Sequence, residues 1–196
     1  MVYMEGDIVN DPLVILGISG SLRKQSYNSA LLRAAVELAP QGARIDTFEL
    51  DGIPPFNQDE EGNPHPKVAE LKQRVREADA ILFVTPEYNY SIPGVLKNAI
   101  DCASRPYGDS AWNGKPVAIM GASVGTLGTA RAQYHLRQTF VFLNMYPVNQ
   151  PEVMVSNAQD RFDQEGRLTD ATTKKLTQQL LAELVNWTKR LQQSAH

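Results

Sequence analysis

The sequence is poor in cysteine and has no long apolar run, and these gaps exclude several classes of protein. Cys102 is the single cysteine among 196 residues, so the chain cannot form an intrachain disulfide, and it fits a reducing compartment. No stretch approaches the ~20 apolar residues of a membrane-spanning helix, and the N-terminus lacks the basic and apolar regions of a secretory signal. The net charge of −3 argues against a nucleic-acid-binding protein, which is usually basic. We therefore expect a cytoplasmic domain of enzyme size, with no membrane or nucleic-acid partner.

Common catalytic and nucleotide-binding motifs are missing as well. The dinucleotide motif G-x-G-x-x-G and the ATP-loop motif G-x-x-x-x-G-K-[ST] do not occur. Ser19 is not in a nucleophile elbow, because that motif needs glycine at position 21, where this chain has serine. The histidines at positions 65, 135 and 196 do not have the spacing of metal ligands. We therefore expect no metal site.

Apolar runs alternate with helical patterns along the chain. Strands are predicted at 13–18, 43–50, 80–84, 117–120 and 152–155, and helices at 29–39, 67–78, 93–104, 129–142 and 169–192. This alternation predicts an α/β fold of three layers, a parallel sheet with helices on both faces. Residues 12–196 are expected to form a single domain after a flexible leader over residues 1–11. The proline-rich segment 51–66 is expected to be an irregular loop with a function.

The segment 19–28, which follows the first predicted strand, suits a monophosphate. Its candidate donors are three hydroxyls, one amide and one guanidinium, those of Ser19, Ser21, Ser26, Asn28 and Arg23. Backbone N–H groups at the start of the following helix add partial positive charge. The alternative is an ordinary strand-to-helix connection with a serine cap, because serine is favoured at helix starts.

Two further loops follow predicted strands and suit a planar ligand. In the segment 85–94, Pro86 and Pro93 stiffen both ends, and two tyrosines between them can press against an aromatic ring. Packing or an interface is the alternative use of such a segment. The segment 121–128 contains three glycines and Ser123, which allow backbone to approach a flat ring. Because ligands of open α/β sheets bind at the carboxyl ends of the strands, we expect the three loops to form one site.

Five segments carry a resemblance to a known family. They are 17–32 (GISGSLRKQSYNSALL), 48–61 (FELDGIPPFNQDEE), 85–101 (TPEYNYSIPGVLKNAID), 103–106 (ASRP) and 129–138 (TARAQYHLRQ), within a similarity that covers residues 13–155. In these segments the chain resembles the NAD(P)H-dependent FMN reductase family, in its chromate, quinone and azo reductase branch. The resemblance implies a flavodoxin-like fold whose five parallel strands follow the order 2-1-3-4-5.

The resemblance also implies an activity. FMN would be bound non-covalently, and NAD(P)H would pass a hydride to it in a ping-pong cycle. Because the cofactor would carry the chemistry, no side chain is expected to act as a catalytic acid or nucleophile. The acceptors would be quinones, azo dyes, chromate, ferric complexes or free flavin. A non-catalytic electron carrier of the flavodoxin type and a flavin-binding regulatory protein are the alternatives. The mild net charge disfavours the carrier, because carriers tend to be strongly acidic.

Residue roles follow from the resemblance by position. The residues expected at the FMN phosphate and its approach are Ser19, Ser21, Leu22, Arg23, Ser26 and Asn28. Those expected around the isoalloxazine ring are Pro86, Glu87, Tyr88, Asn89, Ser91, Ser123 and Gly125. Tyr88, Asn89 and Tyr90 are expected to shape the face open to substrate, and the segment 53–59 to contribute to the acceptor pocket, across a subunit boundary.

The resemblance implies an oligomer as well. Arg131, Tyr134 and Glu152 are similar to residues that make polar contacts between subunits, so a homodimer or a homotetramer is expected, although a solvated basic helix fits these residues equally well. Cys102 stands where many relatives carry tryptophan. We expect its thiol to be buried and inert.

Overall fold

Short apolar segments form the centre of the sheet in the computed structural model, which describes residues 11–194. The strands β1 (Leu13–Ser19), β3 (Ala80–Val84) and β4 (Pro116–Ala122) are buried almost throughout, as expected of parallel strands covered on both faces. The strand β2 (Ala43–Phe48) lies at an edge and buries only two of its residues. The leader expected over residues 1–11 lies outside the described residues, apart from Asp11.

The strands are parallel in the order β2-β1-β3-β4-β5, which confirms the expected order. The fifth position holds two segments, so the sheet of the described residues has six strands and not the five expected. The strand β5 (Tyr146–Pro147) pairs with the start of β4, and β6 (Val153–Val155) pairs with its end. Proline lacks the N–H group that a ladder needs, and Pro147 and Pro151 lie at the interruption.

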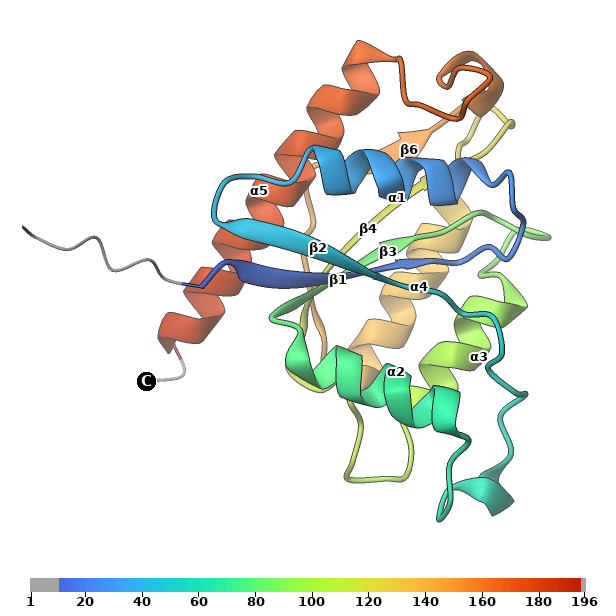
Figure 1. Ribbon diagram of the computed structural model, residues 1–196, viewed down its shortest axis with the longest axis vertical. Coiled ribbons are helices and arrows are strands. Elements are labelled where there is room, and N and C mark those ends of the chain that lie inside the picture. The colour runs from blue at the N-terminus through green and yellow to red at the C-terminus, as the bar shows by residue number, and fades with distance from the viewer. Residues whose placement is uncertain (1–10, 195–196) are drawn as a thin grey trace, which may run out of the picture.

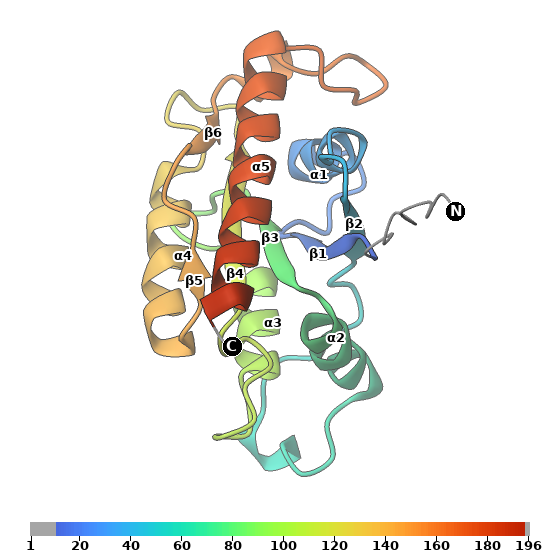
Figure 2. The same ribbon diagram turned by 90° about the vertical axis from the view of Figure 1, so that its left-hand side faces the viewer.

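Helices cover both faces of the sheet, as Figures 1 and 2 show. One face carries α1 (Tyr27–Glu37) and α5 (Ala171–Ser194), and the other carries α2 (Pro66–Glu77), α3 (Gly94–Ala103) and α4 (Ala130–Leu143). Each face closes its own hydrophobic cluster, one containing Ile15 and Leu31 and the other containing Phe83 and Trp112. Burying one such side chain contributes about 1.5–3 kcal/mol, so the two clusters hold the three layers together.

Side-chain caps explain two differences from the predicted elements. The helix α1 begins two residues earlier than expected because the Ser26 hydroxyl accepts hydrogen bonds from the N–H groups of Asn28 and Ser29. The segment 51–66 was expected to be wholly irregular, and this was wrong for a short 3₁₀ turn at Gln58–Glu60. There the Asn57 side chain accepts from the Asp59 N–H and stabilises the turn.

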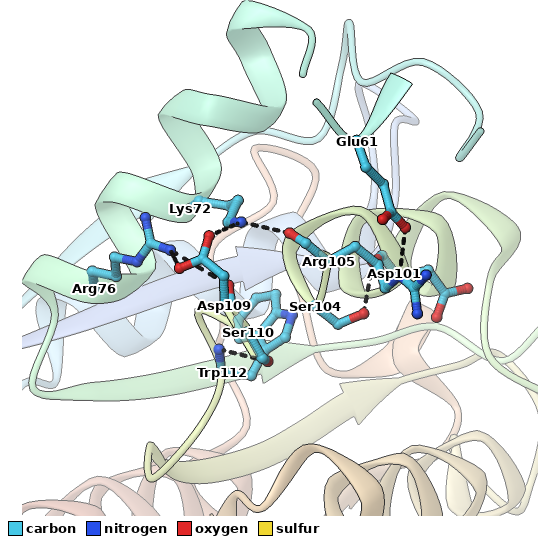
Figure 3. Close-up of polar contacts among 9 residues, drawn as sticks. All are labelled: Glu61, Lys72, Arg76, Asp101, Ser104, Arg105, Asp109, Ser110 and Trp112. Carbon is cyan, nitrogen blue, oxygen red and sulfur yellow. Dashed lines mark hydrogen bonds and ion pairs between the residues drawn. The ribbon is translucent and has the colours of Figure 1, made fainter. Parts of the chain in front are cut away.

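The proline-rich segment packs on its own subunit. The Asn98 side chain on α3 accepts from the Phe56 N–H and donates to the Pro54 carbonyl, each at 2.8 Å. Arg105 pairs with Glu61 at 2.5 Å, and the Lys72 ammonium bonds the Arg105 carbonyl (Figure 3). These bonds fix the segment against α2 and α3.

The neighbouring segment 105–112 is fixed by the same network. Asp109 accepts from Lys72 at 2.7 Å and from Arg76 at 2.6 Å (Figure 3). The hydrogen bond from Lys72 and, after it, the one from Arg76 hold the pKa of Asp109 below its ordinary value. The Trp112 indole, fully buried, donates to the Ile100 carbonyl at 2.9 Å. Both segments thereby become rigid extensions of the helical layer.

Candidate functional site

The three loops singled out in the sequence lie side by side. In the register of the sheet, Ser19 is opposite Val84 and Val84 is opposite Met120, so the strands that precede the loops end together. Backbone bonds continue past the strands, from the Gly20 N–H to the Val84 carbonyl and from the Thr85 N–H to the Met120 carbonyl, both at 2.9 Å. The loops emerge on the right-hand side of Figure 1. This is the edge where open α/β sheets bind ligands.

The loop before α1 has backbone N–H groups that form no hydrogen bond with any other described residue. Within residues 11–194, no acceptor bonds the N–H groups of Ser21, Leu22, Lys24 and Gln25. The Ser26 hydroxyl accepts two N–H groups as the cap of α1, which leaves its own proton free to donate. The guanidinium of Arg23 is exposed and makes no ion pair with any other described residue. Free N–H groups at a helix start beside a cation fit a phosphate dianion.

A groove of about 590 Å³ lies beside this loop, between α1 and the end of β2. It is lined by Ser19, Ser21, Leu22 and Arg23 from the loop, and by Phe48 to Asp51 on the other side. Of the residues expected at the phosphate, four therefore line one open space.

Asn28 is bonded to the neighbouring strand β4. Its side chain is buried, with 4 % of the residue exposed. The amide nitrogen donates to the Ala122 carbonyl and the amide oxygen accepts from the Ala122 N–H, both at 2.9 Å. Asn28 therefore ties the start of α1 to the end of β4, and one N–H of its amide remains for the expected phosphate contact. Ser19 is also engaged, because its hydroxyl lies 3.0 Å from that of Ser29.

The second loop contains a tight turn over Tyr88–Ser91. The Tyr88 N–H bonds the Ser91 carbonyl at 3.1 Å, and the Ser91 N–H bonds the Tyr88 carbonyl at 3.0 Å. The two central residues have positive φ angles, 50° at Asn89 and 67° at Tyr90, as a type I′ turn requires. The turn holds two exposed tyrosine rings at the sheet edge.

The Glu87 side chain is directed toward the start of α4. Its carboxylate accepts from the N–H groups of Arg131 at 2.9 Å and Ala132 at 3.2 Å. The Arg131 guanidinium pairs with the same carboxylate and lies 3.5 Å from the centre of the Tyr90 ring. The hydrogen bond to Glu87 raises the pKa of Arg131. The carboxylate of Glu87 is thus bonded inside the protein, so any contact of this residue with the flavin ring is expected from its backbone.

The remaining residues near the turn make contacts within the subunit. The Ser91 hydroxyl lies 3.0 Å from His135 Nδ1. The Tyr134 hydroxyl donates to Glu152 at 3.0 Å, and this bond raises the pKa of Tyr134. Arg131, Tyr134 and Glu152, expected at a subunit contact, are thus arranged by partners of their own chain.

The third loop adds apolar surface. The Gly125 N–H bonds the Ser123 hydroxyl at 3.1 Å, and the Ser123 N–H bonds the Val155 carbonyl at 2.9 Å. Val124 lies between these two residues and Leu127 follows them, and both expose most of their surface. The three loops together expose five large apolar side chains, those of Leu22, Tyr88, Tyr90, Val124 and Leu127. Such a patch is typical of a ligand or partner site.

Sequence reasoning missed Val124 and Leu127, whereas it did expect backbone donors at the start of α1. A single apolar residue in a loop resembles any other, and the only available signal was the position of both residues between glycines. Gly121 shows how closely the second and third loops approach: a Cβ there would lie 2.2 Å from the Thr85 carbonyl oxygen.

Across residues 11–194, no three or more His, Cys, Asp or Glu side chains gather where they could hold a metal ion. In that part of the chain, no helix is both long enough and apolar enough to cross a membrane.

The donor set fits FMN. Unused N–H groups and Arg23 suit its phosphate, and the exposed apolar side chains beside a rigid turn suit its flat ring.

The model of the family described as NADPH-dependent FMN reductase matches residues 13–160. An NAD(P)H-dependent FMN reductase of Pseudomonas aeruginosa is 55% identical over 185 residues, which are 93% of this chain and 99% of the relative.

Two further relatives point the same way. A 2-hydroxy-1,4-benzoquinone reductase of a Burkholderia species is 44% identical over 89% of this chain and 96% of its own. The solved structure of FerB, a flavoenzyme NAD(P)H:(acceptor) oxidoreductase from Paracoccus denitrificans, superimposes with a TM-score of 0.82 at 35% identity, covering 91% of this chain and 98% of FerB. The chain belongs to the NADPH-dependent FMN reductase family, and it is an oxidoreductase with FMN as cofactor and NAD(P)H as co-substrate.

Proposed function

We propose that this chain is an NAD(P)H:quinone oxidoreductase whose FMN lies across the three loops at the carboxyl edge of the sheet. The observation that carries the proposal is the pairing of unused N–H donors before α1 with exposed apolar side chains on the neighbouring loops. When bound, FMN accepts a hydride from NAD(P)H and gives the electrons to the acceptor.

Each loop has a distinct role in this proposal. The N–H groups of Ser21, Leu22, Lys24 and Gln25, the Ser26 hydroxyl and Arg23 bind the phosphate. The Pro86 to Asn89 backbone, Ser123 and Gly125 border the ring. Glu87, Ser91 and Asn28 support these loops through bonds within the protein. Tyr88, Asn89 and Tyr90 shape the face that NAD(P)H and the acceptor approach in turn.

Quinones are the proposed acceptors because they suit the open rim and because relatives carry that activity in their names. A planar quinone can stack between exposed aromatic side chains such as Tyr88 and Tyr90, which expose much of their surface. Quinone reductases of Pseudomonas putida and Arabidopsis thaliana are 42% and 43% identical to this chain. Azo dyes, chromate, ferric complexes and free flavin are the competing acceptors for the test.

We further propose that the chain works in the cytoplasm as a homodimer or a pair of homodimers. The buried single thiol suits a reducing compartment. The helix α4 supports assembly, because Val141 and Phe142 expose 83 % and 78 % of their surface on its outer side.

Reduction followed in the visible spectrum under anaerobic conditions tests the activity. We expect the purified protein to carry flavin absorption, to lose it when NADPH is added, and to regain it when a benzoquinone follows. Free FMN at the same concentration, without protein, is the control for direct reaction. Protein that takes up no flavin, even from added FMN, would refute the site. Recovery with ferric complexes, chromate or an azo dye but not with a benzoquinone would refute the acceptor class.

A further inference from the structure

The carboxylate of Glu87 belongs to the second loop but is bonded by another element. Its side chain is 5 % exposed, and every group that bonds it lies on α4, 44 or 45 positions away in the sequence. The carboxylate accepts the N–H groups of Arg131 and Ala132 at the start of that helix. Anions are favoured at helix N-termini, and α4 has no capping bond from its own preceding residue, Thr129. Glu87 therefore caps α4 from outside and joins it to the loop.

The same carboxylate controls the position of Arg131. The guanidinium donates to Glu87 through Nε at 2.5 Å. Its central carbon, Cζ, lies 3.5 Å from the centre of the Tyr90 ring. A planar guanidinium held by a carboxylate makes a fixed platform for an aromatic ring. The chain of contacts runs from the helix through Glu87 and Arg131 to Tyr90.

The Tyr90 backbone needs such a support. Its φ angle of 67° lies in the left-handed region, which is unfavourable for a residue with a Cβ. Type I′ turns favour glycine at this position, and strained residues persist where their surroundings hold them. The Tyr90 ring is 68 % exposed, so contact with Arg131 is the support that the structure provides.

We propose that Glu87 is a positioning residue for the cofactor: it holds the Tyr88–Ser91 turn in the shape that receives the FMN ring, acting through Arg131 and α4. The inference rests on the proposed function, because it assumes that FMN lies against this turn. Glutamine is too poor a replacement to hold the turn. Its amide cannot accept from all the donors that face the carboxylate, and it leaves the charge of Arg131 unpaired.

Glu87→Gln is the first variant, and its matched control is Asp170→Asn. Asp170 also accepts a helix N-terminal N–H, that of Thr173, and also pairs with an arginine, Arg161, but at the start of α5. We expect both variants to melt at lower temperature than the wild type. We expect Glu87→Gln alone to weaken FMN binding to the apoprotein about tenfold or more, measured by flavin fluorescence. It alone should also change the visible circular dichroism of bound FMN.

Arg131→Met is the second variant, because it keeps the two backbone N–H groups that donate to Glu87 and removes the guanidinium that pairs with Glu87 and supports Tyr90. It should fold and show the same change in circular dichroism as Glu87→Gln. A wild type that does not bind FMN would refute the proposed function. A wild type that binds FMN, together with a Glu87→Gln protein of unchanged affinity and spectrum, would refute the positioning role alone. If Glu87→Gln does not fold, an unchanged Arg131→Met protein refutes it.

Discussion

Arg23 presents a full positive charge at the start of α1. It is exposed and forms no ion pair with another described residue, so its guanidinium is available to a bound anion. We expect Arg23→Ala to weaken FMN binding by about 1.5–3 kcal/mol, the range of a hydrogen bond to a charged group. Titration calorimetry of the apoprotein with FMN measures this loss. Arg44→Ala is the control, because Arg44 pairs with Asp46 on the edge strand β2. Equal affinities of the Arg23 variant and the wild type would contradict the phosphate site.

Cys102 gives a second prediction for a single side chain. Burial raises the pKa of its thiol above the ordinary value, and the charge of Asp101 adds to the rise. A thiol that is protonated and covered reacts slowly, since the thiolate is the nucleophile. We therefore expect Ellman's reagent to leave the native protein unmodified at pH 8 and to label one thiol in denaturant. Rapid labelling of the folded protein would contradict this prediction and show that the Cys102 thiol is accessible.

Single residues also show that bonding partners far along the chain cannot be predicted from a local sequence pattern. The serines and Arg23 could be assigned from the segment itself, because the donors and the helix start lie together. Asn28 and Glu87 have the right chemistry for a ligand, yet their partners lie 94 and 44 positions away, at Ala122 and Arg131. The pattern within one loop carries no information about such distant partners. Their roles therefore required the three-dimensional arrangement.

At the scale of the element, the carboxylate of Asp170 caps the start of α5. Asp170 accepts the N–H and the hydroxyl of Thr173, each at 2.7 Å, and these bonds lower its pKa, with Arg161 adding to the effect. The folded pKa is below the ordinary value of 3.8, so ionised Asp170 stabilises the folded chain above that pH. The contribution is lost as the pH falls below 3.8 and through the lower folded pKa.

We expect Asp170→Ala to lower the free energy of unfolding by about 1 kcal/mol at pH 7. The difference from the wild type should shrink as the pH falls below 3.8 and through the lower folded pKa, where the wild-type carboxylate becomes protonated. Urea unfolding of both proteins between pH 7 and pH 3 measures the two values. Glu183→Ala, exposed on the same helix, serves as control and should stay close to the wild type throughout. A difference independent of pH would mean that the Asp170 charge does not contribute.

Whole elements could be predicted from the sequence where their period was long enough to recognise. The buried run Ala80–Val84 and the amphipathic helix α5 were located to within two residues. The strand β5 has only two residues, and no period can be recognised in a segment of that length. Its pairing comes from the position of α4, which returns the chain to the start of β4.

At the scale of the molecule, the alternation of strands and helices predicted the layers, because parallel strands need covered faces. The strand order came from the family resemblance. The convergence of the three loops then followed from topology, since the carboxyl ends of β1, β3 and β4 are neighbours. The prediction of how subunits meet, through Arg131, Tyr134 and Glu152, also came from the resemblance.

The outer side of α4 provides a testable surface for that meeting. Val141 and Phe142 are exposed there, and Phe142 borders a hollow of about 340 Å³ that Phe56 and Tyr107 also line. In Figure 2, α4 forms an outer wall of the molecule. Water contact with such a patch is unfavourable, and a second copy of the same face would cover it.

We expect the double variant Val141→Glu, Phe142→Asp to be a smaller oligomer than the wild type, because charges in an apolar interface lose their hydration without gaining partners. Light scattering coupled to size-exclusion chromatography measures the mass of each protein. Val36→Glu is the matched control, an exposed apolar residue on α1 at the opposite face of the sheet, and it should keep the wild-type mass. A double variant of unchanged mass would place the subunit contact elsewhere. A wild type that is already monomeric would reject the oligomer itself, while leaving the FMN site of each subunit intact.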